Sequence, residues 1–238
     1  MKYSPAALLL AIFIISSCGQ KPSENAKSLN IDSINQVKEQ NDSTRKGVVV
    51  ATNLTPVRDR ADMNYAARIG DHIYYCSSKG IVERTDTVGS DRQKLFDLKV
   101  HFIIDKVYLL PLTENDYIIS WQETTYLGLN SYVMRFSANN SRPSWSINYK
   151  APDPGIPVVS NGCVYLSTLG IISKVNLESG QHEWLHDSLY ETTSLKYKRF
   201  DMPRLYNHTV VFFDFPIQGR KGKRDSIWVD DRTGKLIR

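Results

Sequence analysis

The fold prediction begins with residues 161–186, which read Asn-Gly-Cys-Val-Tyr-Leu-Ser-Thr-Leu-Gly-Ile-Ile-Ser-Lys-Val-Asn-Leu-Glu-Ser-Gly-Gln-His-Glu-Trp-Leu-His. It contains three short runs with strand character, over residues 163–167, 171–177 and 181–186. The segments between the runs contain Gly, Ser or Glu-Ser-Gly, which are typical of turns. Short apolar runs bounded by such turns predict three consecutive antiparallel strands.

The same pattern recurs along the chain at a regular interval. A polar turn followed by an apolar run begins at Asp71, Asp116, Asn161 and Asn207, at intervals of 45, 45 and 46 residues. A period near 45 with about four short strands in each unit is typical of a β-propeller blade. The sequence therefore predicts an all-β, β-propeller-like fold with about four blades of four-stranded antiparallel sheet. An open half-propeller and a β-sandwich are the alternatives.

The composition agrees with a strand-rich globular protein. The 238 residues are 41% hydrophobic and 23% charged, which excludes a collagen-like, coiled-coil or wholly disordered chain. The 13 Tyr, 8 Phe and 4 Trp favour strands over helices, because aromatic side chains suit a pleated, half-buried surface. The formal net charge of +5 is modest and spread along the chain, so we expect no nucleic-acid partner.

Residues 161–184 resemble one blade of the pyrroloquinoline-quinone-like (PQQ-like) β-propellers. Blades of that family share a Thr-Gly turn followed four residues later by a docking tryptophan, and Gly180 and Trp184 keep this spacing. Glycine permits the positive φ of a tight turn, and the tryptophan buries a large apolar face between neighbouring sheets. The resemblance therefore implies that Gly180 and Trp184 are structural docking residues.

The other repeats keep this motif in part. The fourth repeat has Gly234 in the turn, but Arg238 stands where the tryptophan would be. The second repeat has Trp145, but Ser141 replaces the glycine. We expect Gly234 and Trp145 to be docking residues as well.

The number of repeats departs from the family, whose members usually close seven or eight blades. Here the fourth repeat ends at Arg238 without an outer strand, and a lone β-branched run at Val48–Ala51 precedes the first repeat. We expect this run to pair into the last blade and close the ring, because an unpaired sheet edge is costly or prone to aggregation. Cys76 and Cys163 lie in non-adjacent repeats, so we expect two separate buried thiols.

The N-terminal residues predict a lipoprotein signal peptide. Residues 1–17 contain Lys2 and an apolar run that is far too short to span a bilayer. The sequence Ile-Ser-Ser-Cys that ends at Cys18 resembles the bacterial lipobox, whose cysteine is acylated, for instance with palmitate, and becomes the first residue of the mature chain. An ordinary signal peptide that is cleaved nearby is the alternative. Gly19, by resemblance to bacterial lipoproteins, favours the outer membrane.

The domain organisation follows from this reading. We expect a signal peptide over residues 1–17, a flexible tether over residues 18–46 and a PQQ-like propeller domain over residues 47–238. The tether is rich in Ser, Asn, Gln and Lys and contains no aromatic residue, so it has too little apolar surface to form a core.

The sequence contains one literal catalytic motif, which the predicted fold argues against. His182-Glu-Trp-Leu-His186 matches the H-E-x-x-H zinc motif, in which two histidines one helical turn apart bind the metal. In the strand predicted here the two histidines would lie about 13 Å apart and could not share one ion. We therefore expect no metal site and no catalytic residue.

A quinone cofactor is not expected either, because the chain has no adjacent cysteine pair and four blades offer too little ring to surround it. The leading hypothesis is a non-catalytic, lipid-anchored envelope protein of the outer membrane or periplasm, which serves as a scaffold and binds a protein partner through its propeller blades. A periplasmic immunity or inhibitor lipoprotein is the second hypothesis. A small-ligand or quinone-binding protein is the third.

Overall fold

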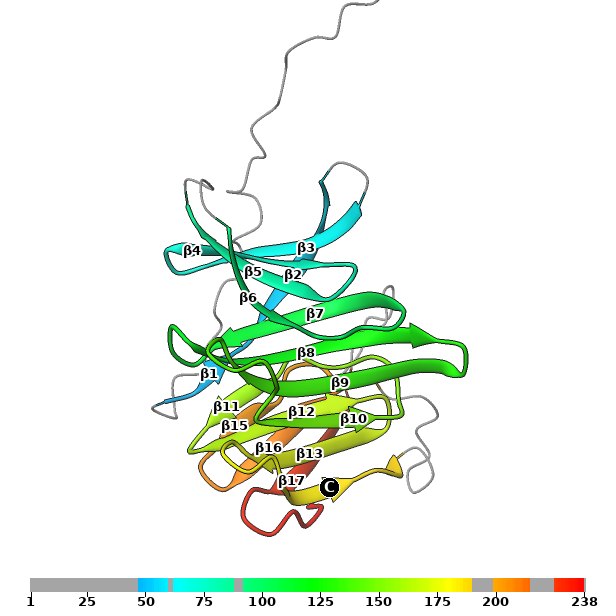
Figure 1. Ribbon diagram of the computed structural model, residues 1–238. Helices are drawn as coiled ribbons and strands as arrows, with labels where there is room; N and C mark the ends of the chain where they lie inside the picture. Colours follow the sequence, from blue (N-terminus) through cyan, green and yellow to red (C-terminus); the bar gives the residue numbers. More distant parts are fainter. Residues whose placement is uncertain (1–46, 60–61, 88–91, 190–198, 215–224, 238) are drawn as a thin grey trace, which may run out of the picture. The chain divides into compact units, whose positions relative to one another are not determined.

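The computed structural model describes residues 47–59, 62–87, 92–189, 199–214 and 225–237. The signal peptide, the tether and Cys18 therefore lie outside the described residues. Every element that is bounded within them is a β-strand (Figure 1), which confirms the all-β prediction. No helix in this described part of the chain is long and apolar enough to cross a membrane.

The strands form four successive antiparallel meanders, one for each sequence repeat (Figure 1). The first contains β3 (Asp62–Ile69), β4 (His72–Ser77), β5 (Ile81–Asp86) and β6 (Gln93–Asp97); the second contains β7 (Ile103–Pro111), β8 (Asp116–Thr125), β9 (Gly128–Ser137) and β10 (Trp145–Tyr149). The third contains β11 (Val158–Ser160), β12 (Cys163–Thr168), β13 (Ile171–Asn176) and β14 (His182–His186); the fourth contains β15 (Arg204–Tyr206), β16 (Thr209–Phe213) and β17 (Ser226–Asp230). In each meander consecutive strands are neighbours, as in a propeller blade. The predicted propeller-like fold with four blades is confirmed. Within the described residues the fourth blade has three strands, and a bridge between Val229 and Leu236 lies where a fourth strand would pair.

The third blade matches its sequence prediction closely. The three predicted strands are β12, β13 and β14, with ends that differ by one residue from the expected ones. One irregularity was not foreseen: the pairing of β13 with β14 shifts by one residue between Lys174 and Val175. A shift of this kind is a β-bulge, which increases the local twist of the strand pair.

The prediction that the run at Val48–Ala51 pairs into the last blade was wrong. β1 (Val49–Val50) pairs with β11 of the third blade, not with the fourth blade. The burial of Val50 and Ala51 explains why β1 pairs with β11. Val50 packs against the core between the third and fourth blades, and Ala51 packs into the core between the second and third blades. Period-two alternation thus gives each face of this sheet an apolar side chain.

A further strand, β2 (Thr52–Asp59), joins the first two blades into one nine-stranded sheet. Residues 52–54 pair with β7, and residues 55–59 pair with β3. Proline has no backbone N–H to donate, and Pro56 lies in the part of β2 whose other side has no strand in the described structure. The proline is therefore tolerated in this strand.

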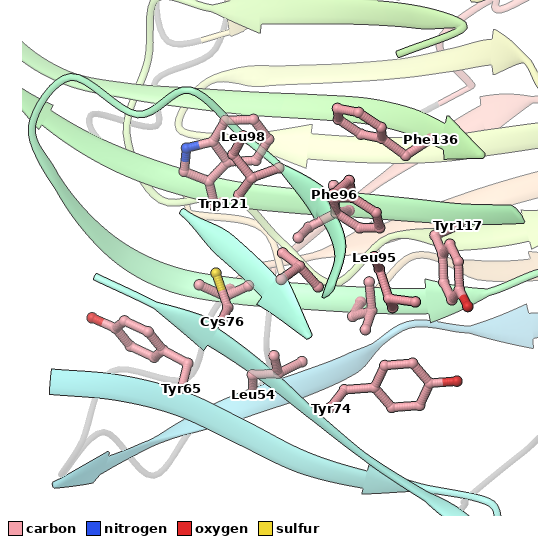
Figure 2. Packing of buried hydrophobic residues seen from close by; sticks show 14 of the residues in the cluster. Leu54, Tyr65, Tyr74, Cys76, Leu95, Phe96, Leu98, Tyr117, Trp121 and Phe136 are labelled. Carbon is pink, nitrogen blue, oxygen red and sulfur yellow. The ribbon is translucent and has the colours of Figure 1, made fainter. Parts of the chain in front are cut away.

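Three apolar cores lie between consecutive blades. Side chains of β2 and the first two blades form one core, where Phe96 and Phe136 stack with ring centroids 4.5 Å apart (Figure 2). A second core joins the second and third blades, and a third core joins the third and fourth. Cys76 lies in the first core (Figure 2) and Cys163 in the third, both as buried free thiols, so the prediction of two separate thiols is confirmed.

Candidate functional site

The structure brings Trp145 of the second blade against Gly180 of the third. Gly180 has a φ of +70°, and a Cβ built on it would lie 2.5 Å from Cγ of Trp145. The indole Nε1 donates a hydrogen bond to the Leu177 carbonyl oxygen at 2.8 Å, and 9% of Trp145 is exposed. The ring therefore lies directly on the turn between β13 and β14.

The same arrangement recurs one blade later. Trp184 of β14 packs against Gly234, whose added Cβ would lie 2.5 Å from Cβ of Trp184. The indole Nε1 donates to the Asp231 carbonyl oxygen at 3.1 Å. Each tryptophan thus contacts the glycine turn of the following blade, rather than the glycine four residues before it. Docking of neighbouring blades by these residues stays a prediction, for which a test is given below.

A buried charge cluster, which the sequence reading missed, joins the third and fourth blades. Lys174 is 9% exposed, and its Nζ lies 2.9 Å from Glu183 and 3.3 Å from Asp231. Tyr165 donates its hydroxyl to Asp231 at 2.8 Å, and the Cys163 thiol donates to Glu183 at 3.2 Å. The hydrogen bond from Lys174 holds the pKa of Glu183 below its usual value. The signal in the sequence was a lysine inside the apolar run Ile-Ile-Ser-Lys-Val, since a lysine is buried only when it is paired.

The H-E-x-x-H sequence lies on β14, as predicted, and not on a helix. His186 makes a hydrogen bond of 2.7 Å through Nε2 to the Gly234 carbonyl oxygen, while the ring of His182 packs against Tyr149 at 6.0 Å. The two imidazoles therefore have different neighbours. Within the described residues, no group of three or more His, Cys, Asp or Glu side chains is placed to hold a metal ion.

The most exposed apolar side chains gather around the turn between β8 and β9. Tyr126 is 93% exposed and Leu127 is 100% exposed, although large apolar side chains are normally covered. Ile103 at the start of β7 and Leu129 of β9 are also exposed, and Phe102 contacts Tyr126 edge-to-face with ring centroids 4.7 Å apart. These five residues form what we call the apolar tip.

The hairpin that carries the apolar tip is long. β8 and β9 each have 10 residues, whereas β10 has five and pairs only with residues 131–135 of β9 (Figure 1). Among the described strands, residues 128–130 of β9 therefore have no neighbour on that side. The turn itself is ordered by Thr125, whose Oγ1 accepts from Leu127 N at 3.2 Å and donates to the Gly128 carbonyl oxygen at 2.9 Å.

A buried carboxylate, that of Glu123, holds the segment before β7 that carries Phe102. Glu123 on β8 is 4% exposed, and its Oε1 accepts hydrogen bonds from the backbone N–H groups of His101 and Phe102, both at 3.1 Å. Hydrogen bonds to an ionised acceptor are among the stronger ones in proteins. These hydrogen bonds hold the backbone at Phe102, whose ring lies beside that of Tyr126, so the backbone around the tip is ordered before binding.

Comparisons with known proteins concern the fold alone. No protein-family model matches the sequence, and no curated protein matches it. The crystal structure of BamB from Moraxella catarrhalis is similar with a TM-score of 0.38 and 14% identity, over 63% of this chain and 40% of that one. The WD40 domain of SCAP from fission yeast is similar with a TM-score of 0.41 and 12% identity, over 79% of this chain and 46% of that one. The matched part spans less than half of either structure.

Proposed function

We propose that this protein is a non-catalytic, lipid-anchored protein of the bacterial envelope that binds a protein partner through its propeller blades, with the apolar tip as the central contact. The observation that carries the proposal is the exposure of two adjacent large side chains, Tyr126 at 93% and Leu127 at 100%, at the turn of one long hairpin. Exposed apolar side chains that gather in one place mark interaction sites, and aromatic residues dominate the binding energy of protein interfaces.

The chemistry of the tip indicates the kind of partner. Residues 124–133 contain no charged side chain, so the turn offers apolar area and neutral hydrogen-bonding groups and no attraction for anionic lipid head groups. An uncharged apolar knob fits an apolar groove on another protein. The anchor is inferred from the lipobox-like sequence that ends at Cys18.

Site-specific photo-crosslinking of the native lipoprotein tests the proposal. A photoreactive phenylalanine analogue at Tyr126 should crosslink a defined envelope protein, which mass spectrometry then identifies. The same analogue at Ser179, an exposed turn residue of the third blade, is the control and should give no such product. The Tyr126→Ser/Leu127→Ser double variant should lose at least 90% of the partner in a pull-down while its melting temperature stays unchanged. The matched variant Leu185→Ser, at an exposed leucine outside the tip, should retain it.

The identity of the partner separates the hypotheses. Membrane assembly or transport components would support a scaffold, whereas a single secreted toxin or hydrolase would assign the protein to the inhibitor class. Equal crosslinking from Tyr126 and Ser179, or undiminished recovery with the double variant, would overturn the apolar tip as the contact.

A further inference from the structure

A cavity of about 340 Å³ lies where segments that precede or begin the inner strands of three blades come together. β2 contributes Asn53, β7 contributes Lys106 and Tyr108, and the segments before β11 and β15 contribute residues 153–156 and 199–201. The volume is within the range of about 300–1,000 Å³ that is typical of small-molecule sites. This cavity is independent of the apolar tip, which shares no residue with it.

Asp153 organises the charged wall of the cavity. It is 9% exposed, and its backbone N–H donates to Gln122 Oε1 at 2.7 Å. One carboxylate oxygen accepts from the Lys106 ammonium group, and the other accepts from Arg199 Nε at 2.7 Å. Both oxygens of the buried carboxylate are therefore occupied, and the two cations are held side by side.

The backbone is unusual at both ends of this contact. Lys106 has a φ of +51° and Asp153 has a φ of +60°, a region that residues other than glycine rarely adopt. Lys106 also lies where the pairing of β7 with β8 shifts between Asp105 and Tyr108. Left-handed residues are costly, and both they and bulges are enriched near functional sites, where a bulge can redirect a side chain.

Three side chains of the lining, Arg199, Lys106 and Tyr108, can donate hydrogen bonds toward the cavity. Within the described residues, the terminal Nη groups of Arg199 have no acceptor, and the Lys106 ammonium group uses only Asp153. Burial, aided by the carboxylates of Asp201 and Asp153, raises the pKa of Tyr108 to about 12, so its hydroxyl stays protonated and can donate. Free donors beside a carboxylate that is already paired suit a ligand that supplies acceptors.

We propose that this cavity binds the carboxylate group of a small organic ligand, with the Arg199 guanidinium and the Lys106 ammonium group as its direct donors. The free edge of a guanidinium matches a carboxylate, which it binds through two parallel hydrogen bonds. The lining contains two cations, Lys106 and Arg199, and two carboxylates, of which Asp153 is paired with both cations, so the free donors of the two cations and not a net positive charge would hold the ligand. Asp201 also lines the cavity, and its negative charge disfavours a ligand with a second anionic group. Ile156 and Pro154 offer the apolar wall for the body of the ligand.

Two sources can supply this chemistry, a free acid or the C-terminal residue of a peptide, and isothermal titration calorimetry of the full-length chain separates them. The probes are 4-methylpentanoate and N-acetyl-leucine, each compared with its own neutral amide. We expect at least one acid to bind at least ten-fold more tightly than its amide. Tighter binding of N-acetyl-leucine assigns a peptide terminus, and equal or tighter binding of 4-methylpentanoate assigns a free acid.

Variants locate the binding. Arg199→Gln and Lys106→Met should each raise the dissociation constant of the acid at least ten-fold. The control Arg142→Gln, which removes an exposed arginine outside the cavity, should change this constant less than two-fold. Circular dichroism checks that each variant folds. The proposal is overturned if neither acid binds at 10 mM probe, if the amides bind equally well, or if a folded Arg199→Gln variant binds as the wild type does.

Discussion

The contact between Trp145 and the glycine turn of the next blade can be tested by one pair of substitutions. Gly180→Ala and Gly162→Ala are in the same blade, at φ values of +70° and +71°. A Cβ at Gly162 would meet no atom within 4 Å, whereas a Cβ at Gly180 would lie 2.5, 2.7 and 2.8 Å from Cγ, Cβ and Cδ2 of Trp145. The two variants therefore differ in the contact with the indole and not in the backbone conformation.

The expected magnitudes follow from two separate costs. An alanine in the left-handed region costs about 1–2 kcal/mol, and this applies to both variants. Overpacking of a well-packed site costs about 1–3 kcal/mol more, and this applies to Gly180→Ala alone. Trp145 cannot move away cheaply, because it is buried and its Nε1 donates to Leu177. We expect Gly180→Ala to lower the free energy of unfolding by about 1–3 kcal/mol more than Gly162→Ala does.

Urea unfolding monitored by far-ultraviolet circular dichroism gives both free energies, because this signal does not depend on the tryptophan itself. In a Trp145→Ala background, which removes Cγ and Cδ2 and keeps only Cβ, the extra cost of Gly180→Ala should shrink. Equal destabilisation by Gly180→Ala and Gly162→Ala would refute the reasoning. It would mean that the indole does not press on this turn in solution.

Four further outcomes are expected. Trp184→Ala should lower the free energy of unfolding by about 3–5 kcal/mol, as for other buried large aromatic residues, and a near-neutral result in the same urea assay would contradict its burial. Cys18→Ala should release the protein from the membrane fraction on ultracentrifugation, and unchanged retention would exclude lipidation at this residue. Burial raises the pKa of Cys76 to about 12, so Ellman's reagent should not label this thiol at pH 8 until urea unfolds the protein. Rapid labelling of the native protein would show that solvent reaches the core around Cys76. Lys174 lowers the pKa of Glu183 in the folded state, so their pairing stabilises the fold above the unfolded pKa of about 4.3, and this stabilisation is lost as the pH falls through the folded pKa. In acid titrations, Glu183→Gln should therefore reduce the slope with which the free energy of unfolding falls below about pH 4.5. An unchanged slope would contradict the pairing.

The local structure of the third blade could be predicted because strand and turn signals act over a few residues. Residues 161–186 alternate short apolar runs with turn residues, and the observed β12, β13 and β14 follow them. The partner of β1 could not be predicted in the same way. A run of valines can add to any open sheet edge, and the choice of β11 depends on the two apolar cores that Val50 and Ala51 enter.

Neither the apolar tip nor the charged cavity could be predicted from the sequence, because both depend on tertiary structure. The residues of the apolar tip match no motif in the sequence. The exposure of the turn between β8 and β9 follows from a hairpin that extends beyond the end of β10. Lys106, Asp153 and Arg199 are far apart along the chain, the first two by 47 positions, and no local pattern connects them. Their meeting depends on how three blades pack.

The all-β class, the period of about 45 residues and the strands within a blade could be derived from the sequence, because hydrophobic alternation and turn residues are local properties. The resemblance to PQQ-like blades also singled out Trp145, Trp184, Gly180 and Gly234, as members of a motif that pairs glycine with tryptophan inside one repeat. Only the tertiary structure decided that each tryptophan contacts the glycine of the following blade. The physical reason is that a tryptophan at the edge of one sheet must bury its ring against another sheet, and the left-handed glycine turn is the surface there without a Cβ.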